Sequence, residues 1–200
     1  MAAKGWQTMA IEETGMFDFQ PTLTGALLEL RPLVPADWGA LYAVASDPLI
    51  WAMHPMRERH QAPVFRAFFD DALGDRGGLV ARDRADGRVI GFSRYSERFA
   101  GPGEVEIGWT FLARDRWGGR WNREMKALML GHAFATYRTV LFRIGEENLR
   151  SRRAVEKIGG VLTDRVQTTT VGDRAIRHVT YAIGRDGFGA GPPGAPAPQP

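Results

Sequence analysis

The sequence predicts an α/β domain built on a mixed, mostly antiparallel β-sheet. Strand-like alternation and helix-like periodicity follow in the order strand, one or two helices, three strands, helix, strand, helix and two strands. Two turn signals, Asp86-Gly87 and Gly172-Asp173, each join two strand-like runs and indicate hairpins. Hairpins at both positions argue against a repeated parallel βαβ array. With 200 residues, 44% of them hydrophobic, the chain is long enough for one core and one domain.

The first strand and the first helices are read from the N-terminal half. Alternation predicts a strand over Ala26–Leu33, and the carboxylate of Asp37 is expected to cap the next helix. Residues Gln61–Gly74 carry five apolar side chains on one helical face, with Pro63 in the first turn and a glycine at the end. These features predict an amphipathic helix that packs on the sheet.

The rest of the chain alternates between predicted strands and predicted helices. Apolar runs on either side of the Asp86-Gly87 turn predict two strands, and a third follows the Gly101-Pro102-Gly103 turn. The periodicity then changes to helical and back. The predicted elements are strands at 77–83, 88–97 and 104–113, a helix through 125–135, a strand at 139–145, a helix at 148–158 and a hairpin at 161–170 and 174–183.

Composition sets the domain limits. Residues 187–200 have no charge and little to pack, so this tail is expected to be disordered. Residues 1–18 are expected to form a flexible leader, as chain ends often do. The folded domain is therefore predicted at residues 19–186.

Charge and residue content exclude several classes of protein. There is no cysteine, and the four histidines lack the spacing of metal ligands, so no metal site is expected. The excess of positive charge is only +3 and no run of five like charges occurs, which gives no reason to expect nucleic acid as a partner. No signal peptide or membrane-spanning stretch is apparent, and a cytoplasmic location is expected.

The stretch RDRWGGRWNREMK, residues 114–126, joins a strand directly to a helix. Such a junction presents unpaired backbone N–H groups at the positive end of the helix dipole, which favours phosphate. Glycine lets the backbone approach an anion closely, and three arginines add positive charge. The simpler alternative is that Gly118 and Gly119 only make a tight turn. Neither a dinucleotide fingerprint nor a P-loop is present.

With this junction, the segments VEIGWTFLARDRWGGRWNREMK and ENLRSRRAVEKIGG resemble the GNAT superfamily of acyl-coenzyme A-dependent N-acyltransferases. The closest branch in appearance is that of the ribosomal-protein N-terminal acetyltransferases (RimJ/RimL-like), and the resemblance extends from about Thr22 to Ile183. It implies a GNAT fold, with a six- to seven-stranded sheet, about four helices and a splay between the fourth and fifth strands. It also implies acetyl-coenzyme A, or another acyl-coenzyme A, as co-substrate.

The family's pyrophosphate loop maps onto the glycine turn, with three departures: Trp117 stands where the family usually has Gln or Arg, and Arg120 and Asn122 replace the two motif glycines. Arg120 stands where the family has its first motif glycine, and its β-carbon resists positive φ, although its guanidinium is equally suited to pair with a phosphate. The arginines at 150, 152 and 153 are candidates for the 3′-phosphate or for a solvated basic face. The coenzyme contacts that the resemblance implies are Thr110, Phe111, Leu112, Trp117, Gly118, Gly119, Arg120, Trp121, Asn122, Asn148, Ser151 and Arg153.

Two residues resemble the family's catalytic positions. Glu106 lies where members often place a carboxylate base on the fourth strand; the alternative is a solvated strand glutamate. Val155 occupies the position of the usual tyrosine acid and has no proton to give. In the resembling branch a serine, here Ser151, donates to the thiolate instead. The alternative for Asn148 and Ser151 is simple capping of the helix.

The resemblance gives less information about the acceptor. Trp51 and His54 lie where the family builds its acceptor pocket, and Arg94 lies on the third strand, so these three residues are the predicted acceptor contacts; core packing is the alternative for Trp51. The predicted activity is transfer of an acetyl or other short acyl group to a primary amine of a protein N-terminus or a small molecule. A non-catalytic acyl-coenzyme A-binding module is the alternative, and both a monomer and a homodimer fit the sequence.

Overall fold

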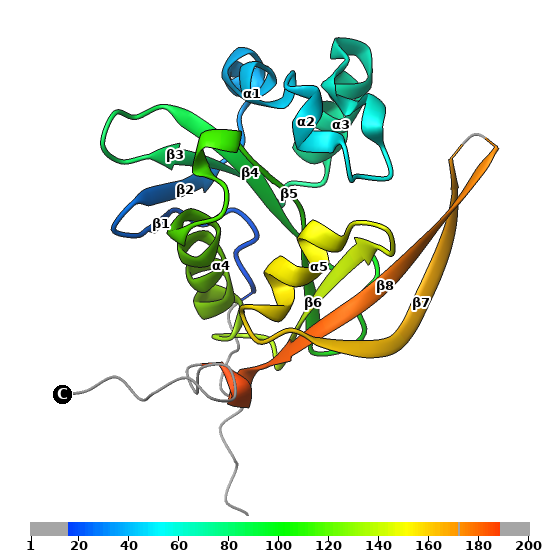
Figure 1. Ribbon diagram of the computed structural model, residues 1–200. Coiled ribbons are helices and arrows are strands. Elements are labelled where there is room, and N and C mark those ends of the chain that lie inside the picture. The colour runs from blue at the N-terminus through cyan, green and yellow to red at the C-terminus, as the bar shows by residue number, and fades with distance from the viewer. Residues whose placement is uncertain (1–15, 172, 189–200) are drawn as a thin grey trace, which may run out of the picture.

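The computed structural model describes residues 16–171 and 173–188 as one eight-stranded sheet with helices on both faces (Figure 1). The strand order is β1-β2-β3-β4-β5-β6-β8-β7, and every neighbouring pair is antiparallel except the parallel pair β5–β6. The strands are β1 Leu23–Thr24, β2 Leu28–Pro32, β3 Gly78–Asp83, β4 Val89–Ser96, β5 Glu104–Leu112, β6 Thr139–Gly145, β7 Val161–Val171 and β8 Arg174–Gly184. The helices are α1 Trp38–Ala45, α2 Pro48–Trp51, α3 Ala62–Gly74, α4 Arg120–Ala133 and α5 Leu149–Glu156, with 3₁₀ turns η1 Pro35–Asp37, η2 Arg57–His60, η3 Arg114–Arg116 and η4 Arg185–Gly187.

The fold class is as predicted, with two corrections. The sheet has eight strands rather than six or seven, because the two residues of β1 fold back on β2. Asp37 does not cap α1 with its side chain. Its carboxylate instead accepts hydrogen bonds from Arg31 and from the backbone of Val34, because Asp37 ends η1 before α1 begins.

Hydrophobic side chains form two clusters on opposite faces of the sheet. Alternate residues of one strand contribute to the two clusters in turn, because successive side chains of a strand point to opposite faces of the sheet. On β4, Ile90 belongs to the cluster beneath α4 and α5, and Phe92 belongs to the cluster beneath α1, α2 and α3. In Figure 1 these three helices lie together above the sheet, apart from α4 and α5.

The sheet opens between β5 and β6. The two strands pair only from Glu104↔Thr139 to Glu106↔Leu141, although β5 continues to Leu112 and β6 to Gly145. Beyond Glu106 the strands diverge, as predicted for the fourth and fifth strands of the sequence. Pro55 fits against β6 at Gly145, where an added Cβ would lie 2.5 Å from its ring.

Strands β7 and β8 form a long hairpin that extends beyond the rest of the sheet (Figure 1). Their register shifts between Leu162 and Val166. An ion pair of 3.5 Å joins Arg174, at the start of β8, to Glu58 of η2. The hairpin therefore contacts the segment between α2 and α3.

The folded part extends slightly beyond both predicted limits, residues 19 and 186. Phe17 is 9% exposed and packs on Phe19, Tyr95 and Tyr137, so the folded part begins before residue 19. Phe188 packs on Phe134, with ring centroids 5.1 Å apart, so residues 187 and 188 belong to the folded part. Most of the predicted leader and tail, residues 1–15 and 189–200, lies outside the described residues.

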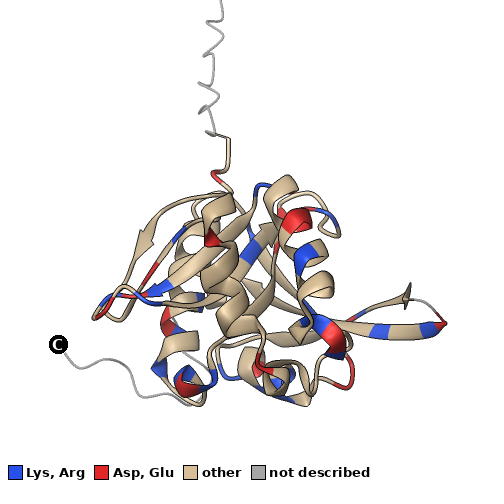
Figure 2. Cartoon of the chain, turned by 90° about the horizontal axis from the view of Figure 1, so that it is seen from above, with Lys and Arg blue, Asp and Glu red and all other residues tan. Residues whose placement is uncertain are grey.

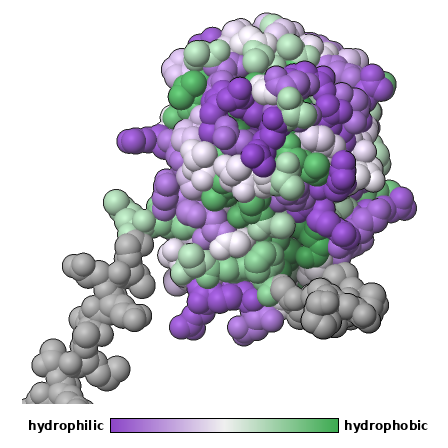
Figure 3. All heavy atoms as spheres, turned by 90° about the vertical axis from the view of Figure 1, so that its left-hand side faces the viewer, coloured by the Kyte–Doolittle hydropathy of each residue, from purple (hydrophilic) through white to green (hydrophobic). Residues whose placement is uncertain are grey.

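Charges of both signs are interspersed over the chain (Figure 2). The face in Figure 3 is largely hydrophilic, with smaller hydrophobic areas between the charged residues. Within the described part of the chain, no helix combines the length and apolar character needed to cross a membrane.

Candidate active site

A cavity of about 1080 Å³ lies at the splay between β5 and β6. Its walls come from the α2–η2 segment, the second half of β5, the turn before α4, and the region from β6 to α5. Residues near the tip of the β7–β8 hairpin close one end. The cavity is therefore framed by elements far apart in the sequence.

The glycine turn brings backbone N–H groups to this cavity. Gly118 has φ +69°, the left-handed region that favours glycine, and Gly119 is the N-cap of α4. No side chain caps this helix, so its first N–H groups keep their hydrogen-bonding capacity. Such groups bind anions at the positive end of the helix dipole.

Arg120 adds charge to the turn without backbone strain. It is the first residue of α4, whereas the positive φ falls on Gly118. The objection that its β-carbon resists positive φ therefore does not apply. Five further basic residues on α4, on α5 and directly after α5 also line the cavity: Arg123, Lys126, Arg150, Arg153 and Lys157.

Gly118→Val should weaken coenzyme A binding about tenfold, because forcing a β-branched residue to positive φ costs about 1–2 kcal/mol and shifts the turn. The space around Gly118 is open, so the effect isolates backbone strain. Gly131→Val is the matched control, since Gly131 lies in α4 without positive φ, has open space around it and does not line the cavity. Calorimetric titration with coenzyme A measures both; equal affinities in the two variants would contradict the role of the turn.

A β-bulge shapes the middle of the cavity. Between the pairs Phe92↔Phe111 and Arg94↔Gly108, β5 contains one residue more than β4, and Trp109 has φ +53°. A non-glycine residue at such φ is strained and must be held by its surroundings. The Arg94 guanidinium stacks 3.8 Å from the centre of the Trp109 ring and provides that support.

Lys126 of α4 is buried at the floor of the cavity. Its Nζ donates to Thr110 Oγ1 at 2.5 Å and to Ser93 Oγ at 3.1 Å, and it lies 5.7 Å from the centre of the Phe142 ring. No carboxylate of the described residues pairs with it, and burial lowers its pKa to about 7. This lysine, which sequence analysis did not single out, links β4, β5 and β6 at the splay.

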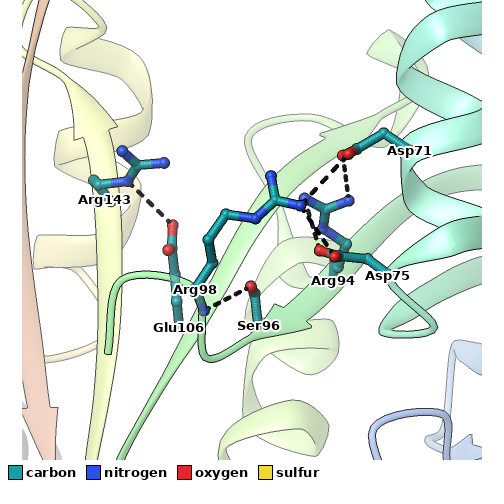
Figure 4. Close-up of polar contacts among 7 residues, drawn as sticks. All are labelled: Asp71, Asp75, Arg94, Ser96, Arg98, Glu106 and Arg143. Carbon is teal, nitrogen blue, oxygen red and sulfur yellow. Dashed lines mark hydrogen bonds and ion pairs between the residues drawn. The ribbon is translucent and has the colours of Figure 1, made fainter. Parts of the chain in front are cut away.

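Glu106 is the only carboxylate among the described residues that line the cavity. Its side chain is 3% exposed, and burial raises its pKa to about 7 despite the nearby Arg143 guanidinium. Arg143 Nε lies 3.8 Å from Oε1, while Oε2 has no hydrogen-bond partner (Figure 4). A carboxylate with a pKa near neutrality and a free oxygen is suited to accept a proton. The alternative interpretation, a solvated strand glutamate, does not hold because the side chain is buried.

The nearby acidic residues serve a different purpose. Asp71 of α3 and Asp75, the C-cap of α3, bind Arg94 and Arg98, as Figure 4 shows. Arg94 is fully buried and does not line the cavity, so it acts here as the support beneath Trp109. Removing either aspartate would leave buried positive charge without a full set of partners.

The start of α5 contributes two polar residues. Asn148 is the N-cap and accepts a hydrogen bond from the Ser151 backbone at 3.2 Å, which is the capping contact expected from the sequence. Both residues line the cavity, as does Val155. Among the described residues, no partner takes a hydrogen bond from the Ser151 hydroxyl.

At the other end of the cavity lie Trp51 and His54. Trp51 is 2% exposed and donates to the backbone of Ala45, so it is a core residue with one edge in the cavity. Burial lowers the pKa of His54 to about 3, and the neighbouring Arg59 adds to the effect. His54 is therefore neutral at physiological pH.

The cavity brings together most of the predicted site residues. Of these, only Trp121 and Arg94 do not line it. Trp121 lies under the Arg116 guanidinium, 4.9 Å from it, and packs on the core. The lining residues that sequence analysis did not single out include the three basic residues Arg59, Lys126 and Arg143. No group of three potential metal ligands occurs within residues 16–171 and 173–188.

An uncapped turn from strand to helix, next to a splayed pair of strands and a buried carboxylate, is the arrangement that the predicted acyl-coenzyme A-dependent transferase requires. The chain belongs to the GNAT acetyltransferase family, since the model of the acetyltransferase (GNAT) domain matches residues 28–161. It is an N-acetyltransferase that uses acyl-coenzyme A as co-substrate and an amine as acceptor.

Solved structures share the fold. A GNAT-family acetyltransferase from Chromobacterium violaceum is 20% identical, with a TM-score of 0.77 over 94% of this chain and 98% of that one. Mycobacterium smegmatis RimJ, in complex with CoA-disulfide, is 19% identical, with a TM-score of 0.66 over 86% and 91%. Spermidine N-acetyltransferase from Vibrio cholerae, with CoA and spermine, is 16% identical, with a TM-score of 0.62 over 81% and 98%. No curated protein matches the chain in sequence.

Proposed function

We propose that the protein transfers an acetyl or other short acyl group from coenzyme A to a primary amine, with Glu106 as general base and Ser151 as proton donor to sulfur. The acceptor is a small molecule or the N-terminus of a protein. The observation that carries the proposal is the buried carboxylate of Glu106, which faces the same cavity as the unpaired N–H groups of α4.

The residues divide into two groups by position. The N–H groups at the start of α4 and the cations around them hold the diphosphate. The splay beyond Glu106 leaves room for an extended chain between β5 and β6. A ligand anchored at the turn therefore extends toward Glu106.

The chemistry then needs two proton movements. Glu106 takes one proton from the acceptor ammonium, which frees the lone pair that forms the new C–N bond. Acetyl-coenzyme A supplies the thioester whose C–S bond breaks. The second proton of the attacking nitrogen reaches the sulfur, and the Ser151 hydroxyl donates to that sulfur.

The test is to follow thiol release from acetyl-coenzyme A with a panel of amines, together with product mass. The expected result is release above the rate of hydrolysis with at least one class of amine. Rates equal to hydrolysis with every amine, despite coenzyme binding, would favour a binding module instead.

Ser151→Ala should lower kcat about tenfold, with little change in KM for the acceptor, because a single hydrogen bond to the leaving sulfur is lost. Asn148 still caps α5 through its bond to the backbone N–H at position 151, so the helix should remain intact. Steady-state kinetics measure the effect. An unchanged kcat when chemistry limits the rate would remove Ser151 from the mechanism.

A further inference from the structure

The acceptor end of the cavity presents a surplus of hydrogen-bond donors. Arg59 of η2, Arg143 of β6 and the imidazoles of His54 and His178 line this end, with Glu106 as the one carboxylate in the described lining. Arg143 lies 3.8 Å from Glu106, but Arg59 forms no ion pair with any described carboxylate. Arg120 and Arg123 lie on another element, α4, which begins directly after the glycine turn.

Hydrogen bonding fixes the tautomer of His54. Its Nδ1 accepts the backbone N–H of Met56 at 2.9 Å, and the ring is neutral, so Nε2 carries the proton. Nε2 faces Arg59 Nη1 at 3.3 Å. An arginine has only donors, so two N–H groups meet there without an acceptor between them.

The donor pair is held in place before any ligand binds. The Arg59 guanidinium lies 4.7 Å from the centre of the Phe68 ring and 5.5 Å from that of Trp51. His54 packs edge-on against Trp51, with centroids 5.4 Å apart. Aromatic contacts on both groups limit their freedom, so little ordering is needed when an anion binds.

We propose that the acceptor amine also carries a carboxylate, which binds between Arg59 and His54 while its amine reaches Glu106. This proposal depends on the proposed transferase activity. Convergent N–H groups, one of them charged, are complementary to the two oxygens of a carboxylate. A diamine would instead place its second ammonium beside Arg59, where like charges repel.

The experiment compares acceptors of equal length that differ in one group. The ω-amino acids from glycine to 6-aminohexanoate are tested against the n-alkylamines and α,ω-diamines of matching chain length. At the chain length that gives the highest rate, kcat/KM of the amino acid should exceed that of the matching alkylamine and diamine by about 10- to 100-fold. This is the range expected for hydrogen bonds to a charged group.

Arg59→Met removes the charge and keeps an apolar stem against Trp51 and Phe68. The substitution should raise KM for the amino acid by about 10- to 100-fold. The kcat and the KM of the alkylamine should remain nearly unchanged. Arg57→Gln is the matched control, because Arg57 is exposed on the same 3₁₀ turn and does not line the cavity. It should behave like the wild type.

Calorimetry on the protein–coenzyme A complex tests the subsite independently of turnover. The amino acid of best length should bind the wild type at least tenfold more tightly than it binds Arg59→Met. Equal rates for amino acids and alkylamines, a preference for diamines, or an equal loss by Arg59→Met toward all acceptors would overturn the proposal. Binding of the amino acid without turnover of any amine would contradict the transferase mechanism but support the carboxylate subsite.

Discussion

Glu106→Gln should reduce kcat/KM about 100-fold or more at pH 8 and leave coenzyme A affinity unchanged. General base catalysis contributes about 10²–10⁴-fold, and glutamine keeps the shape of the side chain without its basicity. In the wild type, kcat/KM should rise through an inflection near pH 7, because burial raises the pKa of Glu106 to about 7 and only its ionised form accepts a proton. The variant should lack this inflection.

Glu104→Gln is the matched control for this experiment. Glu104 lies on the same strand and pairs with Arg165 through two hydrogen bonds, away from the cavity. It should retain the wild-type rate and pH profile. A Glu106→Gln enzyme with the wild-type profile would eliminate Glu106 as the base.

Glu106→Gln should not lower the stability of the fold. Because the folded-state pKa of Glu106 lies above its unfolded value, its contribution to stability is present below about pH 4.5 and lost as the pH rises through 7. Above pH 7 the glutamine variant should therefore unfold at a denaturant concentration equal to or above that of the wild type. Denaturant titration at pH 8 thus separates loss of the base from loss of structure.

Lys126→Met should raise the free energy of unfolding at pH 7 by about 1–4 kcal/mol, the gain seen when buried charged groups are replaced by apolar ones. The two hydroxyls that Lys126 contacts keep each other as partners, since Ser93 Oγ and Thr110 Oγ1 lie 2.8 Å apart. The substitution therefore leaves no orphaned polar group on them.

The pH dependence gives this prediction a second readout. Burial lowers the pKa of Lys126 from 10.5 to about 7, so between these values the unfolded chain binds more protons than the folded one. Wild-type stability should thus rise with pH from about 7 to 10.5, and the advantage of the variant should shrink over that range. Lys157→Met, at an exposed position, should change stability by less than about 0.5 kcal/mol. A variant less stable than the wild type, or a constant difference across pH, would refute the cost assigned to the buried charge.

Local sequence patterns predicted most of the elements because each depends on neighbours in the chain. The hairpin turns, the Asn148 cap and the glycine turn before α4 are of this kind. The short strand β1 was missed because a two-residue strand has no period to detect. Asp37 was misassigned because its partner Arg31 competes for the same carboxylate.

The site was only partly predictable for a related reason. Glu106, Ser151 and the turn were proposed from motifs that resemble a family, and all three line the cavity. Arg59 lies outside the segments quoted for the resemblance, and Lys126 ends one of them without any role being assigned to it, because a buried basic residue and an exposed one look alike in sequence. Their importance comes from contacts across the fold, with Trp51 and Phe68 in one case and with Ser93 and Thr110 in the other.

The two hydrophobic clusters on opposite faces of the sheet have a consequence for how the enzyme can diversify. Changes beneath α1, α2 and α3, around Phe65 and Phe69, share few direct partners with those beneath α4, around Met125 and Met129. Energetic effects of substitutions that share no partners are close to additive. Under the proposed mechanism, selection can therefore remodel the layer beneath α1, α2 and α3 while the layer beneath α4 keeps its geometry, so new acceptors can evolve without loss of the donor.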